Sequence, residues 1–198
     1  MSNYFANAGQ VLISFVFGAA LAIVLLRQMA ELARVDFYNP ICQFLYRTTS
    51  PLVVPMRRLV PRMGRVNLAP LLLAYLVATI EVLLVTLVEG MVPRVPGLLL
   101  MALASVLDNL LVLYMVIIFV TALVSLFDVD AQHPLVPFVD QIATPVLRVL
   151  RRRLPAIAGF DISPAAAIVI ILLARALVVQ PLSDFALRMA VGPLGLGG

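Results

Sequence analysis

Three charged side chains lie inside otherwise apolar stretches of this 198-residue chain: Glu81, Asp108 and Arg175. A lone charge at the centre of a bilayer costs about 2.5–3.5 kcal/mol on insertion scales, so such residues usually pair or serve a function. Glu81 and Arg175 carry opposite charges, and each follows a proline by 11 residues. Those prolines are Pro70 and Pro164. Because 11 residues of helix are about 16 Å long, we predict that Glu81 and Arg175 lie at the same depth and pair in a bundle interior.

Asp108 is open to two interpretations. The apolar residues 110–127 nearly suffice to cross a membrane alone, which would place Asp108 near the outer surface. Alternatively, Asp108 is a second partner for Arg175. The predicted Glu81–Arg175 pair is more typical of a clamp between helices than of an ion or proton pathway, because the nearby Ser and Thr residues form no continuous polar lining by sequence alone.

Two stretches combine prolines, apolar residues and arginines: PLVVPMRRLVP at 51–61 and PVLRVLRRRLP at 145–155. An arginine stem can lie along apolar surface while its guanidinium binds phosphate, often through two hydrogen bonds. These arginines could orient the chain by charge alone, or bind anionic lipid head groups or an acidic partner. The candidate binding residues are Arg57, Arg58, Arg148, Arg151, Arg152 and Arg153.

Other reactive side chains are scarce. The only histidine, His133, and the only cysteine, Cys42, have no neighbours at the spacing of a metal or catalytic site. No phosphate-binding glycine loop, zinc motif or nucleophile elbow is present. All 14 basic residues are arginines scattered between apolar runs, which argues against nucleic-acid binding. We therefore expect a protein that is not an enzyme and has no cofactor, metal or catalytic site.

The elements that must position these residues are membrane spans. The chain is 63% apolar and only 12% charged, far from the composition of a soluble domain. Apolar runs predict helices at about 9–33, 68–89, 98–127 and 164–187, each long enough to cross a bilayer. The first run lacks a preceding basic residue, so we expect a retained span rather than a signal peptide. No alternating strand pattern appears, and the predicted fold class is an all-α membrane protein.

The chain is also a duplication. A shift of 94 residues aligns eight identities without a gap between residues 36 and 70, and four of them are prolines. Prolines at fixed offsets indicate a shared backbone path. We predict a first unit at 1–94, a second at 95–190 and a flexible tail at 191–198. Each unit is a hairpin of two spans, so the two units form a parallel repeat whose axis follows the membrane normal.

The charge distribution predicts the topology. Arginines concentrate in the long loop of each unit, whereas the connector between the units has only Arg94 and the tails have only Arg188. Positively charged loops stay in the cytoplasm, so both termini should be periplasmic. In each cytoplasmic loop, the proline-containing stretch should form a short amphipathic segment at the head groups. Asn67 and Asp161 occupy equivalent positions before the second span of each unit, where each can cap a helix.

The stretches DFYNP (36–40), SPLVVPMRRLVP (50–61) and TPVLRVLRRRLP (144–155) resemble the YggT family of integral membrane proteins. The resemblance covers essentially the whole chain as two tandem units. It is less close in the second unit, where Val149 replaces Pro55 and Arg153 replaces Leu59. The resemblance implies a multipass protein of the bacterial inner membrane. Family members are associated with osmotic stress tolerance, with cell division and envelope organisation, and, in plastid relatives, with haem attachment.

Together these observations favour a scaffold or accessory factor that docks anionic lipids or a membrane or cytoplasmic protein partner, and that could form a homo-oligomer. A channel or transporter component for ion uptake under osmotic stress is the alternative.

Overall fold

The structure is a computed structural model that describes residues 2–58, 60, 66–127, 130, 132–153 and 161–191. In this part of the chain the regular structure is helical and contains no β-sheet. The predicted all-α class is therefore confirmed. The elements are α1 (Ser2–Ala33), α2 (Pro40–Met56), α3 (Leu68–Val88), α4 (Val95–Leu126), α5 (Leu135–Arg151), α6 (Ser163–Ala174), the π-helical turn η1 (Arg175–Val179) and α7 (Gln180–Val191).

Four of these helical stretches are long and apolar enough to cross a membrane. They are Tyr4–Ala33, Leu68–Val88, Val95–Leu126 and Ser163–Val191, the last of which runs through α6, η1 and α7 without a break. Backbone amides and carbonyls must be satisfied internally in lipid, which is why apolar runs of this length fold as helices. The four predicted spans are thus present. The predicted unit boundary at residues 94 and 95 stays a prediction, and all but Val191 of the predicted tail lies outside the described residues.

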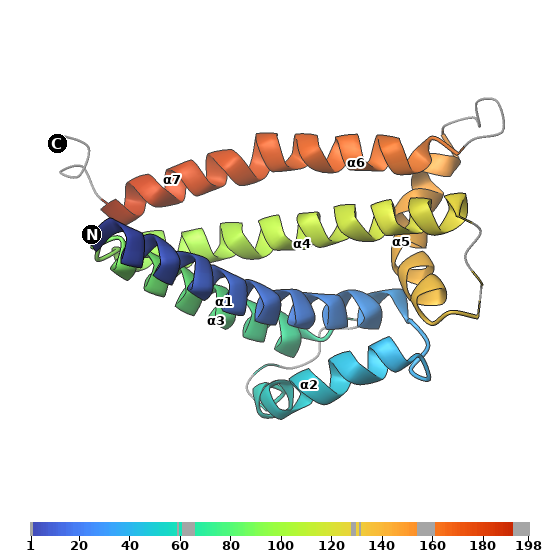
Figure 1. Cartoon of the computed structure of the whole chain (residues 1–198), viewed down its shortest axis with the longest axis horizontal. Helices are drawn as coiled ribbons and strands as arrows, with labels where there is room; N and C mark the ends of the chain where they lie inside the picture. Colours follow the sequence, from blue (N-terminus) through green and yellow to red (C-terminus); the bar gives the residue numbers. More distant parts are fainter. Residues whose placement is uncertain are drawn as a thin grey trace.

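α4 lies between the last span on one side and the pair α1 and α3 on the other (Figure 1). α1 packs along α3 to form the first hairpin, and α4 packs along α6 and α7 to form the second. α4 also packs against α3, so it separates the two second spans. In the part of the chain that is described, α3 makes no close backbone contact with α6, η1 or α7. The second and fourth spans, which carry Glu81 and Arg175, are therefore not packed against each other.

α2 and α5 are the equivalent helices of the two loops, and each has 17 residues. They are longer than the short segments predicted between the prolines, because the chain stays helical through Pro51, Pro55 and Pro145. In Figure 1, α5 crosses the spans at one end of the bundle, whereas α2 runs obliquely beside α1 and α3. Each helix buries one face against the protein, so its apolar side serves the protein core as well as the membrane surface. The buried residues are Cys42, Leu45, Thr49 and Val53 in α2 and Phe138, Val139, Ile142, Ala143 and Leu147 in α5.

The two ends of the bundle differ. The start of α1 and the end of α7 are both at the end of the bundle opposite α5 (Figure 1). There α4 and α7 approach so closely that a Cβ at Gly97 would collide with the backbone of Ala190. The backbone N–H of Arg94 also donates to the carbonyl of Ala190 at 3.0 Å. Glycine at this position permits the close approach of the two helices.

Candidate functional site

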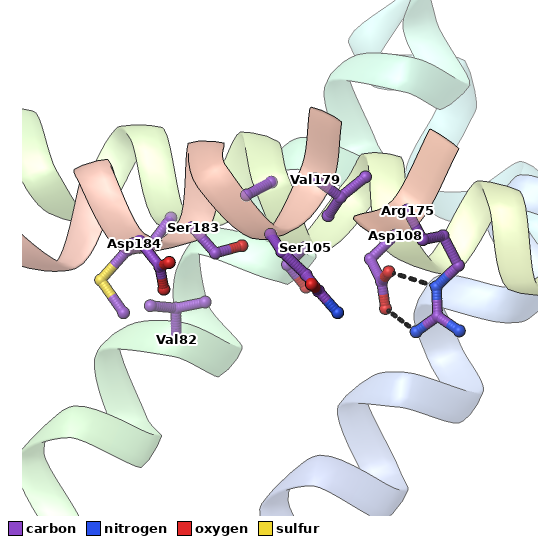
Figure 2. Close-up of a pocket in the computed structure, with 10 residues that line it drawn as sticks. Val82, Ser105, Asp108, Arg175, Val179, Ser183 and Asp184 are labelled. Carbon is purple, nitrogen blue, oxygen red and sulfur yellow. Dashed lines mark hydrogen bonds and ion pairs between the residues drawn. The ribbon is translucent and has the colours of Figure 1, made fainter. Parts of the chain in front are cut away.

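Arg175 pairs with Asp108 inside the bundle. Its guanidinium Nε lies 2.7 Å from Asp108 Oδ1, and Nη2 lies 2.9 Å from Oδ2, a two-pronged ion pair that Figure 2 shows. The predicted Glu81–Arg175 pair is therefore wrong. A shift of 94 places Glu81 and Arg175 at matching depths, but α4 lies between their helices and supplies Asp108 instead. The interpretation of Asp108 as a partner for Arg175 is the correct one.

A local widening of the last span begins at Arg175. Residues Arg175–Val179 form a π-helical turn, in which the N–H of Gln180 donates to the carbonyl of Arg175 five residues earlier. The next residue is Pro181, which has no N–H and whose ring would collide with the carbonyl four residues before it in a regular α-helix. A π turn accommodates this proline and is a frequent feature of functional sites. The equivalent position in the first unit is Leu87, within the regular helix α3.

A cavity of about 370 Å³ adjoins the ion pair. Figure 2 shows residues of α3, α4 and the last span around it, with Asp108 and Arg175 at one side and Ser183 and Asp184 at the other. Asp108 and Arg175 are each about one-third exposed, so both remain accessible from the cavity. The cavity has the size and polarity to hold a small polar solute, an ion or water. Its lining consists of Val82, Met101, Ala104, Ser105, Asp108, Arg175, Val179, Gln180, Ser183 and Asp184.

Glu81 does not line this cavity, although the next residue, Val82, does. Its side chain is half-buried in α3, and its Oε2 atom is buried without a hydrogen-bond partner among the described residues. The structure therefore separates the two carboxylates that the sequence places within the membrane. Asp108 is paired through both oxygens, whereas Glu81 forms no ion pair with any residue that the structure describes.

A second buried cation, Arg27, was not among the predicted site residues. Arg27 lies in the C-terminal part of α1 and is only 1% exposed. Its Nε donates to Glu31 Oε1 at 3.1 Å, and its Nη1 donates to Thr49 Oγ1 of α2 at 2.7 Å. The guanidinium also lies over the ring of Tyr46, 4.4 Å from its centroid. Glu31 and Arg27 are four residues apart at the end of an apolar helix, a spacing that could have indicated the pair.

Glu31 extends the network to the third helix. Its Oε2 accepts a hydrogen bond from Asn67 Nδ2 at 3.1 Å, while Asn67 Oδ1 caps α3 by accepting from Ala69 N. Burial, followed by the nearby Glu31 carboxylate, raises the pKa of Tyr46 to about 12. One polar network thus joins α1, α2 and α3.

The family model described as CCB3/YggT matches residues 6–88 and 100–182. The two segments differ by a shift of 94 residues and together cover most of the chain. The chain belongs to the CCB3/YggT family. It is 34% identical to the uncharacterised protein YggT of Escherichia coli K12 over 160 residues, which is 80% of this chain and 82% of that protein.

Two further relatives are similar. An uncharacterised protein from Pseudomonas aeruginosa is 33% identical over 165 residues, 82% of this chain and 84% of the relative. An uncharacterised protein encoded in the proC 3′ region of Vibrio alginolyticus is 31% identical over 159 residues, 79% of this chain and 85% of the relative. No solved structure matches the chain.

Each YggT segment contains one of the arginine-rich stretches. The structure does not join these stretches into one surface, because the C-terminal ends of α2 and α5 point to different places (Figure 1). The six predicted arginines are all exposed: Arg57, Arg58, Arg148, Arg151, Arg152 and Arg153. Arg151 differs from the others, since its Nε lies 2.8 Å from Asp161 Oδ2.

Asp161 also accepts a hydrogen bond from Ser163 N at the start of the last span of the second YggT unit. The predicted capping role is confirmed for Asn67, the N-cap of α3. Asp161 lies one residue before the N-cap of α6, Ile162, and accepts from the first amide of that helix. Burial alone raises the pKa of Asp161, but hydrogen bonds from Ser163 and the Arg151 guanidinium outweigh this effect and lower it overall.

The lone histidine and cysteine of this YggT protein have local structural contacts. His133 Nδ1 accepts from Leu135 N at 3.3 Å at the start of α5. Cys42 is buried in α2, and its pKa is raised by burial and then by Asp36. No group of three His, Cys, Asp or Glu residues that could hold a metal occurs among the described residues.

Proposed function

We propose that this chain is a non-enzymatic scaffold or accessory factor of the bacterial inner membrane. In this proposal the exposed arginines at the ends of α2 and α5 bind anionic lipid head groups. These contacts hold the protein at sites of envelope organisation, cell division or osmotic adaptation, and a membrane or cytoplasmic partner docks there. The observation that carries the proposal is the repeated placement of exposed arginines at the end of a helix packed on the bundle.

Packing gives these arginines a defined position. Val53 of α2 and Leu147 of α5 are both fully buried near the helix ends, so each arginine group projects from a fixed element. A guanidinium that is already positioned loses less conformational freedom when it binds phosphate. The positive-inside rule favours the cytoplasmic side for both loops, and both termini are then periplasmic.

The proposal is tested by measuring lipid retained by the purified protein. We expect that changing Arg57, Arg58, Arg152 and Arg153 to Gln lowers the phosphatidylglycerol and cardiolipin bound in native mass spectrometry at least several-fold. Arg151 is left intact because it holds Asp161. The matched control changes Arg94 and Arg188, exposed arginines near the opposite end, to Gln. Equal lipid loss in the test and control variants would contradict specific docking.

A channel or transporter component for ions is a second candidate, and the polar cavity beside Asp108 and Arg175 is the observation that favours it. This candidate predicts ion flux in liposomes that contain the purified protein. Flux should fall when Asp184 is changed to Asn, because the carboxylate lines the cavity. Flux equal to that of protein-free liposomes would exclude this candidate and leave the scaffold proposal untouched.

A further inference from the structure

Glu81 is an acidic side chain within a span, and none of the described residues is its electrostatic partner. It lies 13 residues after Leu68 and seven before Val88, which are the ends of α3. At 1.5 Å per residue these distances are about 20 Å and about 10 Å. Its Oε2 is buried, and no described residue donates a hydrogen bond to it. The carboxyl therefore lies within the span and at neither of its ends.

The charged groups on the elements around α3 are committed elsewhere or are distant. α3 packs against α1, α2 and α4. On α1, Arg27 and Glu31 bind each other, and Glu31 also accepts a hydrogen bond from Asn67, the N-cap of α3. On α4, Asp108 is held by Arg175.

On α2 and directly after it, three arginines are exposed and form no ion pair with Glu81: Arg47, Arg57 and Arg58. At the far end of α3, Glu89 is exposed and accepts from Gln10. No cation of the described residues therefore compensates a charge on Glu81.

An ionised carboxylate in such a place is unfavourable. Removing an ion from water costs several kcal/mol in a protein interior unless a partner or several hydrogen bonds replace the water. A buried carboxyl without a partner avoids this cost by binding a proton. Asp108 lies in the same membrane but has both oxygens on a guanidinium, so it can remain charged.

We propose that Glu81 is a proton-binding site within the membrane and carries its proton at neutral pH. The two intramembrane carboxyls then differ in state: Glu81 is a neutral acid, and Asp108 is an ion-paired carboxylate. This site is independent of the scaffold and transport proposals, since it rests only on the surroundings of Glu81.

The proposal predicts selective reaction with dicyclohexylcarbodiimide, an apolar reagent for protonated carboxyl groups. The carboxyl proton moves to a carbodiimide nitrogen, and the carboxylate oxygen adds to the central carbon. The resulting O-acylisourea rearranges to a stable N-acylurea, so nothing leaves and the peptide gains one reagent mass. In the full chain in liposomes at neutral pH, peptide mass spectrometry should find the label on Glu81 and not on Asp108.

Three variants make this result decisive. Glu81→Gln should reduce labelling of that peptide to background, and Glu89→Gln, which changes an exposed carboxylate at the end of the same helix, should leave it intact. Arg175→Gln should free Asp108 and make it reactive, which shows that the reagent reaches this depth. Labelled Asp108 in that variant together with unlabelled Glu81 would overturn the proposal.

Infrared spectroscopy provides a readout that does not depend on reagent access. The carbonyl stretch of a protonated carboxylic acid should be present in the wild type and in Glu89→Gln, and lost in Glu81→Gln. A wild-type spectrum without that band would show that Glu81 is ionised at neutral pH, and a band of unchanged intensity in Glu81→Gln would show that Glu81 does not contribute to it. Either result would end the proposal.

Discussion

The two YggT units hold equivalent loop helices in place by different means. In the first unit, the buried Arg27 joins α1 to Thr49 of α2, and Glu31 joins α1 to α3. In the second unit, the position equivalent to Arg27 is Thr121, whose hydroxyl donates only to its own helix at Ile117. There α5 is held by apolar packing instead, and Phe138 is 4% exposed where its counterpart Phe44 is 58% exposed.

This difference shows which features the duplication preserved. The order of helices and the path of the backbone are common to both units, because the prolines and apolar runs that set them are shared. The charged groups are placed independently. Asp108 and Arg175 correspond to Ser14 and Glu81 in the first unit, so neither partner of the intramembrane ion pair is repeated. The two units therefore share a backbone path, whereas the Arg27 network occurs in the first unit and the Asp108–Arg175 pair in the second.

The largest expected effect comes from removing Arg27. Arg27→Met deletes a cation that is 1% exposed and leaves Glu31 and Thr49 without their partner. Losing one member of a buried pair typically costs about 3–5 kcal/mol. We expect a large fall in the melting temperature of the detergent-solubilised protein, measured by differential scanning fluorimetry.

Two further variants test whether the uncompensated charge on Glu31 causes this loss of stability. Arg47→Met removes an exposed arginine of α2 and should leave the melting temperature nearly unchanged. The double variant Arg27→Met, Glu31→Met removes both charges and should regain much of the loss. If the double variant is no more stable than Arg27→Met alone, the uncompensated charge is not the cause.

The second prediction compares equivalent aromatic residues. Phe138→Ala should destabilise the protein by about 3 kcal/mol, because a buried ring is replaced by a cavity. Phe44→Ala should cost much less, since that ring is already exposed at 58%. Unfolding in increasing denaturant measures both. Equal losses would mean that α2 and α5 depend on apolar packing to the same extent.

The third prediction concerns the intramembrane ion pair. Arg175→Gln leaves Asp108 with at most a neutral hydrogen-bond donor, and we expect a loss of about 1–3 kcal/mol. The loss should be smaller than for Arg27, because the pair is about one-third exposed to the cavity. Glu81→Gln at the equivalent position of the first unit should change the melting temperature little. If Glu81→Gln lowers the melting temperature more than Arg175→Gln does, then Glu81 and not Asp108 is the carboxylate whose interactions stabilise the protein.

The sequence predicts the spans and the polar residues at the helix starts correctly, because each depends on residues that are close together in the chain. Long apolar runs predict spans because lipid leaves the backbone no other way to satisfy its polar groups. Asn67 and Asp161 each accept a hydrogen bond from the amide two residues later, so the sequence alone suffices to predict both contacts. The partner of Arg175 could not be found in this way. A shift of 94 identifies equivalent positions, but only the packing of α4 between α3 and the last span decides which carboxylate is near.

The same limit applies to α2 and to Arg27. The prolines of 51–61 suggested short interfacial pieces, yet Val53 is fully buried and the helix extends back to Pro40. Each proline removes one backbone hydrogen bond from the helix. The burial of one face of α2 favours the helix despite this loss, and local sequence does not show that burial. Local sequence does not indicate that Arg27 is buried against α2, because its partner Thr49 lies 22 residues later in the chain.

The smallest expected effect is that of the surface pair between Arg151 and Asp161. Exposed pairs contribute at most about 1 kcal/mol, and Asp161→Asn keeps a capping oxygen like that of Asn67. The pKa of Asp161 is lowered in the folded protein, so its contribution is present above the ordinary value of 3.8 and is lost as the pH falls through the lowered value. The wild type should therefore lose its small advantage over Asp161→Asn on acidification.

Melting temperatures measured from neutral pH to below 3.8 test this expectation. Asp140→Asn, which changes an exposed carboxylate of α5, should keep the pH dependence of the wild type. If Asp161→Asn also keeps it, the Arg151–Asp161 pair makes no measurable contribution. The second unit would then match the first at this position, where Asn67 caps the helix without a charge of its own. The difference between the units would be confined to their buried networks and to the ion pair within the membrane.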